Sequence, residues 1–167
     1  MALTGAWGLL TAEALLLAEQ FAEGHRICVI LGDNIIERHI RDQAESFAAQ
    51  PSGARVLLKE VDDPHRFGVP RFEDDRIVEI IEKPAEPPSG FAVTGLYFYD
   101  HDVFNIARQL DRSPRGELEI TEVNNAYLRR GDLSHGTVDG WWTDAGTFES
   151  LFRANRLVAA GGANRMM

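Results

Sequence analysis

Two apolar runs, separated by one helix-length segment, constrain the fold of this chain most. The first, at 26–31, ends in a Gly-Asp-Asn loop at 32–34, and the second, at 54–61, follows a Pro-Ser-Gly breaker. Between them, apolar residues recur at helical spacing from 36 to 50. Strand, loop, helix and strand in this order predict an α/β sheet with a right-handed crossover. The unbroken first run predicts a parallel-sheet strand buried on both faces.

The rest of the chain continues the alternation. Residues 11–23 are rich in helix formers, with Thr11 as the expected N-cap and Gly24 as the expected stop. The other expected elements are, in order, a hairpin at 67–84 with a polar turn, a strand at 91–100, a helix capped by Asp100, a helix at 117–130, a strand at 133–140, a loop at 141–147 and a helix from Thr147 to about residue 160. We expect one domain over 1–160 and a flexible tail over 161–167.

Charge and composition narrow the classes of partner. The formal net charge is −9 and the pI is about 5.0, which argues against nucleic acid or an anionic membrane as the main partner. The longest apolar stretch, at 14–18, is too short to span a bilayer, and the N-terminus has no charged signal-peptide region. Cys28, the single cysteine, is expected to be a buried inert thiol. A cytoplasmic protein is the expectation.

Two aspartates stand where an expected strand or loop meets a helix. Asp33 follows the first apolar run, and Asp144 lies in the Trp-Trp-Thr-Asp-Ala-Gly-Thr segment. Ligands of open α/β sheets bind beyond the carboxyl ends of strands, and carboxylates there suit a hard cation such as Mg²⁺. Each aspartate is equally a candidate for capping the helix that follows it. Their spacing in the sequence does not show whether they meet.

Further candidates surround an anion or sugar. Glu82 and Lys83 end an expected strand on opposite faces, and the lysine could meet a phosphate. Arg115 precedes an expected helix start, where an anion could bind. Glycines in the segments at 66–68 and 93–95 allow close approach of the backbone. Trp141 and Trp142 form either a stacking wall or part of the core. Taken singly, Glu82 and Lys83 fit solvated surface residues better than binding residues.

Taken together and in order, these motifs resemble a known family. The segments LGDN, RFGV, EKP, AVTGLYFYD, RGELEIT and WWTDAGT are similar to those of the sugar nucleotidylyltransferases, most closely the glucose-1-phosphate thymidylyltransferases. The similarity runs from about Thr11 to Leu157. It implies a nucleotide-diphospho-sugar transferase fold, which is Rossmann-like, with a mixed sheet and flanking helices.

The resemblance also implies roles for single residues. Asp33 and Asp144 match the pair that holds catalytic Mg²⁺. Positions around the sugar and its phosphate are matched by Gly68, Glu82, Lys83, Val93 and Arg115, and a position near the same pocket by Trp142. Lys83 and Arg115 would be catalytic, and the others would bind substrate. The implied reaction joins glucose 1-phosphate to dTTP, giving dTDP-glucose and pyrophosphate, a step of nucleotide-sugar biosynthesis such as the dTDP-rhamnose pathway.

One departure from the family pattern is large. The sequence contains no G-x-G-T-R loop to cradle a triphosphate, and its only lysines are Lys59 and Lys83. The resemblance therefore implies an N-terminally truncated transferase that is inactive or impaired by itself, so its status as an enzyme stays open. The alternatives are a non-catalytic domain that binds sugar phosphate or nucleotide sugar or only self-associates, and a half-enzyme completed by another chain. An uncovered sheet edge would favour a homo-oligomer.

Overall fold

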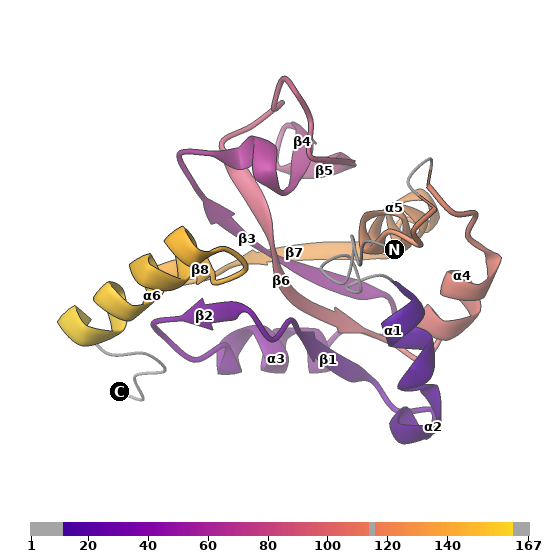
Figure 1. Cartoon of the computed structure of the whole chain (residues 1–167). Helices are drawn as coiled ribbons and strands as arrows, with labels where there is room; N and C mark the ends of the chain where they lie inside the picture. Colours follow the sequence, from indigo (N-terminus) through magenta and orange to yellow (C-terminus); the bar gives the residue numbers. More distant parts are fainter. Residues whose placement is uncertain (1–11, 114–115, 162–167) are drawn as a thin grey trace, which may run out of the picture.

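The computed structural model describes residues 12–113 and 116–161, which form a curled mixed sheet flanked by helices (Figure 1). The helices are α1 (Ala12–Leu17), α2 (Glu19–Ala22), α3 (Arg41–Ala48), α4 (Val103–Gln109), α5 (Ile120–Arg130), α6 (Phe148–Gly161) and the 3-10 turn η1 (Pro64–Arg66). The strands are β1 (Ile27–Ile30), β2 (Asn34–Ile36), β3 (Ala54–Glu60), β4 (Gly68–Glu73), β5 (Arg76–Glu82), β6 (Phe91–Tyr99), β7 (Leu133–Thr137) and β8 (Trp142–Asp144). The α/β fold class expected from the sequence is confirmed.

Strand β6 organises the main sheet, whose order is β5–β4–β6–β3–β7. It pairs antiparallel with β3 along one side, and with β1 and the start of β4 along the other. Strands β1 and β3 therefore run in the same direction with β6 between them, and β7 continues parallel to β3. Strands β2 and β8 form a separate two-stranded ribbon.

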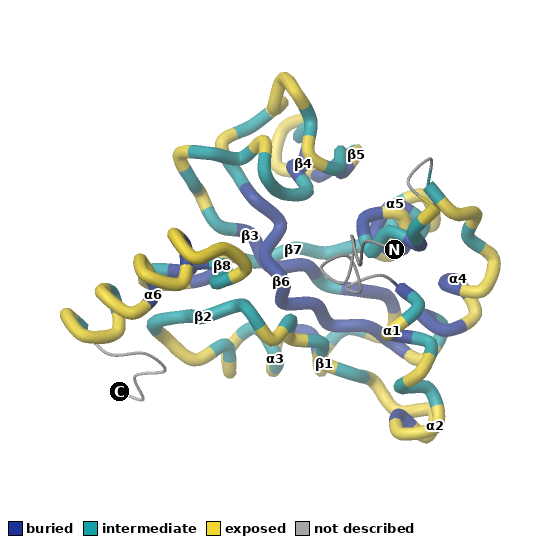
Figure 2. The backbone as a smooth tube through the Cα atoms, viewed as in Figure 1, coloured by how far each residue is buried: buried dark blue, intermediate teal, exposed yellow. Residues whose placement is uncertain are grey.

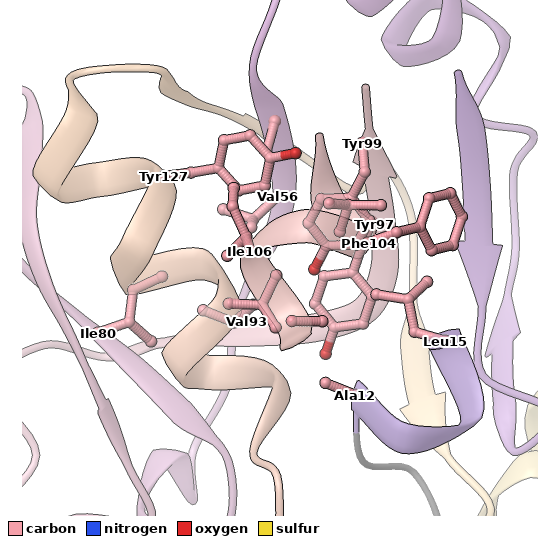
Figure 3. Close-up of a cluster of buried hydrophobic side chains, with 14 of the residues drawn as sticks. Ala12, Leu15, Val56, Ile80, Val93, Tyr97, Tyr99, Phe104, Ile106 and Tyr127 are labelled. Carbon is pink, nitrogen blue, oxygen red and sulfur yellow. The ribbon is translucent and has the colours of Figure 1, made fainter. Parts of the chain in front are cut away.

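The two faces of β6 belong to two apolar clusters, because successive side chains of a strand point to opposite faces. Val93, Tyr97 and Tyr99 face the cluster completed by α1, α4 and α5, part of which is drawn in Figure 3. Leu96 and Phe98 face the smaller cluster that includes Phe47 of α3 and Trp142 of β8. Figure 2 shows β6 as a buried line through the middle of the molecule. Every residue of β6 after Phe91 is buried.

Most element predictions are confirmed, several of them with shifted ends. The hairpin, with its turn at Asp74 and Asp75, is present, and so are the strand at β6, the Gly131 stop of α5 and the last helix. Thr147 caps that helix, since its Oγ1 accepts the backbone N–H of Ser150 at 3.1 Å. Thr11 and residues 162–167 lie outside the described residues.

Several predictions about the first half are wrong. The expected buried parallel strand is β1, which is antiparallel to β6 and alternates between half-buried and exposed residues. Because successive side chains of a strand point to opposite faces, this pattern means that one face of β1 is exposed. Cys28 lies on its exposed side and is not a buried thiol. The expected helix at 36–50 starts only at Arg41, since Ile36 belongs to β2. The helix at 11–23 is broken at Ala18, whose N–H bonds to Leu15 in a tighter turn.

Three later predictions need correction as well. The expected loop at 141–147 contains β8, and the helix expected from residue 117 starts at Ile120. The N-cap position of α4 is Asp102, two residues after the predicted cap, but the Asp100 carboxylate does accept the backbone N–H of Asp102 at 3.1 Å at the start of that helix. Asp100 is also a buried acceptor for Gly53 N–H and Tyr127 O–H, each at 2.6 Å. No helix among the described residues combines the length and apolar character needed to cross a bilayer.

Candidate functional site

The ribbon β2–β8 brings the two predicted metal-binding aspartates together. Asn34 of β2 stands opposite Asp144 of β8, and the carbonyl of Asp33 accepts the N–H of Ala145 at 2.7 Å. Both carboxylates border Gly146. A Cβ built there would lie 3.2 Å from Oδ2 of Asp33 and 3.8 Å from Oδ2 of Asp144. The bare glycine therefore leaves room between the two acids.

Neither aspartate caps the helix that follows it, so the alternative that each serves as a helix cap is wrong. The N-cap position of α3 is Ile40, and α6 is capped by Thr147. Oδ1 of Asp33 instead accepts a hydrogen bond of 2.8 Å from the side-chain amide of Asn34. Oδ2 of Asp144 lies 3.2 Å from Nη2 of Arg66. Both carboxylates are thus held by side chains and turned toward one place.

The pKa of Asp144 lies above its usual value. Burial is the largest cause, the positive charge of Arg66 opposes it, and the negative charge of Asp33 adds to it. Repulsion between two neighbouring carboxylates disfavours the state in which both are ionised, unless a cation neutralises them. The donor set, two carboxylates with space for water, suits a hard divalent ion. No cluster of three or more His, Cys, Asp or Glu side chains suited to a metal occurs among the described residues, so protein ligands would complete only part of a shell.

Three of the predicted sugar-binding residues lie side by side on adjacent strands. Gly68 of β4 stands opposite both Glu82 of β5 and Val93 of β6. A Cβ on Gly68 would come within 3.5 Å of Oε2 of Glu82 and 3.3 Å of Oγ1 of Thr121. Thr121 of α5 donates to that same carboxylate oxygen at 2.6 Å. The glycine thus leaves the acid accessible beside a flat stretch of backbone.

Lys83 departs from its expected orientation. The residue follows β5 with a positive φ of 44°, and its Nζ lies 3.7 Å from Oε1 of Glu82. The two side chains therefore gather at one place instead of diverging to opposite faces. Lys83 N–H is anchored to the carbonyl of Phe67 at 2.9 Å. Arg115 lies outside the described residues.

Tyr97 is a buried residue that no motif in the sequence had indicated, and one acid of each group affects its hydroxyl through charge. Its ring is 4% exposed and stacks on Tyr99 (Figure 3). Burial raises the pKa of its hydroxyl above the ordinary value, and the charges of Glu82 and then Asp33 raise it further. Among the described residues no hydrogen-bond partner meets that hydroxyl. A buried polar group without a partner is uncommon and marks a place where a ligand can supply the missing bond.

The signal for Tyr97 was present in the strand pattern. Alternation along β6 places Gly95 and Tyr97 on the same face as Val93, which is one of the predicted sugar-binding residues.

Asn34 is a second missed residue. Its Oδ1 accepts hydrogen bonds from Gly95 N–H at 2.8 Å and from Nε1 of Trp142 at 2.7 Å, while its Nδ2 donates to Asp33. Gly95 is required here, because a Cβ would lie 2.4 Å from Nδ2 of Asn34. One amide thus connects the loop of Asp33 to the central strand and to β8.

Trp142 is 6% exposed and packs edge-on against Phe67 at 5.2 Å between ring centres. It belongs to the smaller core cluster, so the core alternative describes its contacts.

Two hollows of the described surface are large enough to receive a ligand. One, of about 610 Å³, is bordered by Glu82 and Thr121 and by the segment from Gln109 to Ser113. The other, of about 730 Å³, lies between the tip of the β4–β5 hairpin and β7, and none of the predicted site residues lines it. The acid that stands beside Gly68 therefore also borders open volume.

Comparison with known proteins identifies the family of the chain. The model of the nucleotidyl transferase family matches residues 6–161. A glucose-1-phosphate thymidylyltransferase from Neisseria meningitidis is 44% identical over 151 residues, which cover 88% of this chain and 52% of that protein. One from Xanthomonas campestris is 42% identical, with 88% and 51% covered. The chain thus spans about half the length of these curated relatives.

Solved structures show the same fold. A crystal structure assigned as a glucose-1-phosphate thymidylyltransferase from Bacillus anthracis, in complex with sucrose, has a TM-score of 0.83 and 55% identity, with 87% of this chain and 59% of that chain covered. A UDP-glucose pyrophosphorylase complexed with UDP-glucose has a TM-score of 0.79 and 25% identity, with 92% and 62% covered. On the family match over residues 6–161, this chain belongs to the nucleotidyl transferase family.

Proposed function

We propose that the chain forms the metal and sugar-phosphate side of a glucose-1-phosphate thymidylyltransferase site. One observation carries this proposal. The carboxylates of Asp33 and Asp144 border the same glycine, Gly146, and the charges of Asp33 and Glu82 both act on the buried hydroxyl of Tyr97. The reaction is the joining of glucose 1-phosphate and dTTP to give dTDP-glucose and pyrophosphate.

Asp33 and Asp144 would hold Mg²⁺. The room above Gly146 and the all-oxygen donor set support this assignment. When bound, the ion supplies positive charge that offsets the charge on the phosphate groups and helps to align them. Asn34 fixes the orientation of Asp33 before any ligand arrives, because its amide donates to that carboxylate.

Glu82, Gly68 and Val93 would receive the sugar. The Glu82 carboxylate can accept hydrogen bonds from sugar hydroxyls, and Thr121 keeps it in place. The missing side chain of Gly68 lets a ring approach the backbone. Tyr97 O–H would donate to, or accept from, the same ligand. Trp142 would support the pocket from behind.

Lys83 would bring a positive charge to the phosphate, and Arg115 is assigned the same role from the sequence alone. Holding the attacking phosphate oxygen in line with the nucleotide is the main contribution that such residues make to phosphoryl-group transfer.

Turnover by this chain alone should be slight. Of its two lysines, Lys59 donates to the carbonyl oxygens of Val138 and Gly140, and Lys83 lies beside Glu82. Main-chain carbonyls thus hold Lys59, Lys83 is assigned to the phosphate of the sugar, and no G-x-G-T-R loop that could cradle a triphosphate occurs in the sequence. This observation favours binding of sugar phosphate or nucleotide sugar, or completion of the site by another chain, over activity of the chain by itself.

Self-association is part of the proposal, with a second copy of this chain as the partner. Among the described residues β1 pairs only with β6, and Ile30 is 55% exposed. Helix α6 separately exposes Phe148 at 95% and Phe152 at 65%. Both a strand edge without a partner and exposed apolar side chains favour contact between copies. Size-exclusion chromatography with light scattering measures the mass of the particle and so tests self-association. A particle with the mass of one chain at about 100 µM protein would contradict it.

Two assays test the site itself. We expect a thermal shift with millimolar dTDP-glucose and Mg²⁺. The shift should be lost in Glu82→Ala and in Asp144→Asn, and kept in Asp139→Asn, which removes an exposed acid nearby in the sequence. Pyrophosphate release from dTTP and glucose 1-phosphate should stay close to background. Absence of any shift would refute the sugar pocket, and clear turnover would refute the expected impairment.

A further inference from the structure

Arg66 is a protein cation that already contacts one of the two proposed metal ligands. It ends η1, and its Nη2 lies 3.2 Å from Oδ2 and 3.5 Å from Oδ1 of Asp144. One guanidinium nitrogen thus contacts both oxygens of that carboxylate. A divalent cation binding Asp144 must share these oxygens with the guanidinium or displace it.

The guanidinium has a second place to stay. Nη1 of Arg66 lies 2.9 Å from Oδ2 of Asp63, three residues earlier, and the guanidinium carbon lies 5.2 Å from the centre of the Phe67 ring. These contacts do not involve Asp144. The arginine can therefore leave Asp144 and remain paired, which lowers the free energy needed to release it.

The other proposed ligand is held differently. Asp33 accepts from the neutral amide of Asn34, and among the described residues no cation forms an ion pair with it. The two carboxylates are therefore unequal. A neutral amide holds Asp33, whereas a charged group that repels any incoming cation contacts Asp144.

We infer that Arg66 is a resident competitor for the divalent cation, which occupies Asp144 in the metal-free protein and shifts onto Asp63 when the cation binds. The inference rests on the proposed assignment of Asp33 and Asp144 as metal ligands. Arg66 thereby keeps the carboxylate pair partly neutralised before metal binding and weakens the metal affinity. Asp63 acts in the opposite sense, because it draws the guanidinium away.

Opposite signs for the two partners make the test specific. We would titrate the full chain with Mn²⁺ and measure free ion by electron paramagnetic resonance, with no substrate present. Arg66→Gln should bind Mn²⁺ about fivefold more tightly, the factor of a ~1 kcal/mol half-exposed ion pair, and Arg66→Lys should stay within about twofold of the unaltered chain. Asp63→Asn should bind about twofold to threefold more weakly, because Asp144 is then the one carboxylate among the described residues with which Arg66 forms an ion pair.

Two control substitutions distinguish direct competition by Arg66 from a general effect of net charge on Mn²⁺ affinity. Arg71→Gln removes an arginine whose ion-pair partners among the described residues are Glu73 and Glu79. Asp62→Asn removes an exposed acid next to Asp63 in the sequence. Both should leave the affinity within about twofold. If Arg66→Gln does not fold, the ratio of the Mn²⁺ affinities of Asp63→Asn and Asp62→Asn tests the same inference.

The outcomes distinguish this inference from the proposed function. Mn²⁺ binding that is lost in Asp33→Asn and Asp144→Asn, together with the expected changes at Arg66 and Asp63, supports both. Binding at those aspartates that is unchanged or weaker in Arg66→Gln overturns the inference alone. No Mn²⁺ binding by the unaltered chain, or binding that survives both aspartate substitutions, overturns the metal site and the inference with it.

Discussion

Asn34→Ala should lower the free energy of unfolding by about 2–4 kcal/mol. The substitution leaves two donors without their acceptor, the N–H of Gly95 at 2.8 Å and Nε1 of Trp142 at 2.7 Å. A buried donor left without a partner costs about 1–3 kcal/mol, and the lower part of that range applies here because Asn34 itself is only half-buried and water can reach part of the gap. The bond to Asp33 adds less, since that carboxylate can turn to water.

Urea unfolding followed by tryptophan fluorescence measures this loss directly. Asn34→Asp provides a graded comparison, because it keeps the acceptor for both donors but places a negative charge beside Asp33. Its loss should be smaller than that of the alanine variant. Asn105→Ala, an exposed asparagine whose Oδ1 accepts only from Arg108, is the control and should change stability by about 0.5 kcal/mol or less. A loss below about 1 kcal/mol in Asn34→Ala would refute the view that this amide joins the strands.

Three further predictions concern single side chains. Asp144→Asn should be at least as stable as the unaltered chain at pH 7, because a raised native pKa means that ionisation of Asp144 destabilises the fold as pH rises through that pKa. The difference should shrink as the pH falls toward the ordinary carboxyl value, and a variant clearly less stable at pH 7 in urea unfolding would contradict it. Tyr97→Phe should leave the free energy of unfolding unchanged or raise it by up to about 1 kcal/mol, since it removes a buried hydroxyl without a partner, and it should weaken the dTDP-glucose thermal shift. A loss of stability in this variant would mean that the hydroxyl does have a hydrogen-bond partner. Thr147→Ala should lose about 1 kcal/mol through the N-cap of α6, whereas Thr147→Ser should lose little, as measured by helical circular dichroism on heating.

The sequence predicted the long, locally encoded elements well. Alternation and a polar turn predict the β4–β5 hairpin, and aromatic and β-branched residues predict β6. Both elements were therefore predicted with nearly correct ends. Short strands are a different matter. Strands β2 and β8 have three residues each, and only their pairing with one another defines them. A sequence pattern carries little information about such a pairing.

The burial of β1 was predicted wrongly for a related reason. An apolar run such as Ile27–Ile30 is typical of a strand covered on both faces, but its neighbours are set by sheet order, which is a property of the whole chain. Here β6 lies between β1 and β3, and it leaves β1 at an edge with Cys28 and Ile30 on the exposed side.

The candidate site was predictable in its residue types and not in its connections. Motifs located Asp33, Asp144, Gly68, Glu82 and Val93, and the strand registers then brought them into two neighbouring groups. Hydrogen bonds between distant segments, such as Asn34 with Trp142, and ion pairs, such as Arg66 with Asp144, depend on the folded geometry. Residues of this second kind act through their contacts, and composition alone does not reveal them.

The central claim is that the carboxylate pair and the Glu82 group form one site for a metal ion and a sugar phosphate. Relaxation of the ³¹P signal of glucose 1-phosphate by Mn²⁺ tests it most directly, because the paramagnetic effect falls steeply with distance. We expect the chain to enhance this relaxation beyond that of Mn²⁺ and ligand alone. The enhancement should be lost in both Asp144→Asn and Glu82→Ala but kept in Asp139→Asn. Enhancement that is absent in the unaltered chain, or that persists in either site variant, would contradict a shared site.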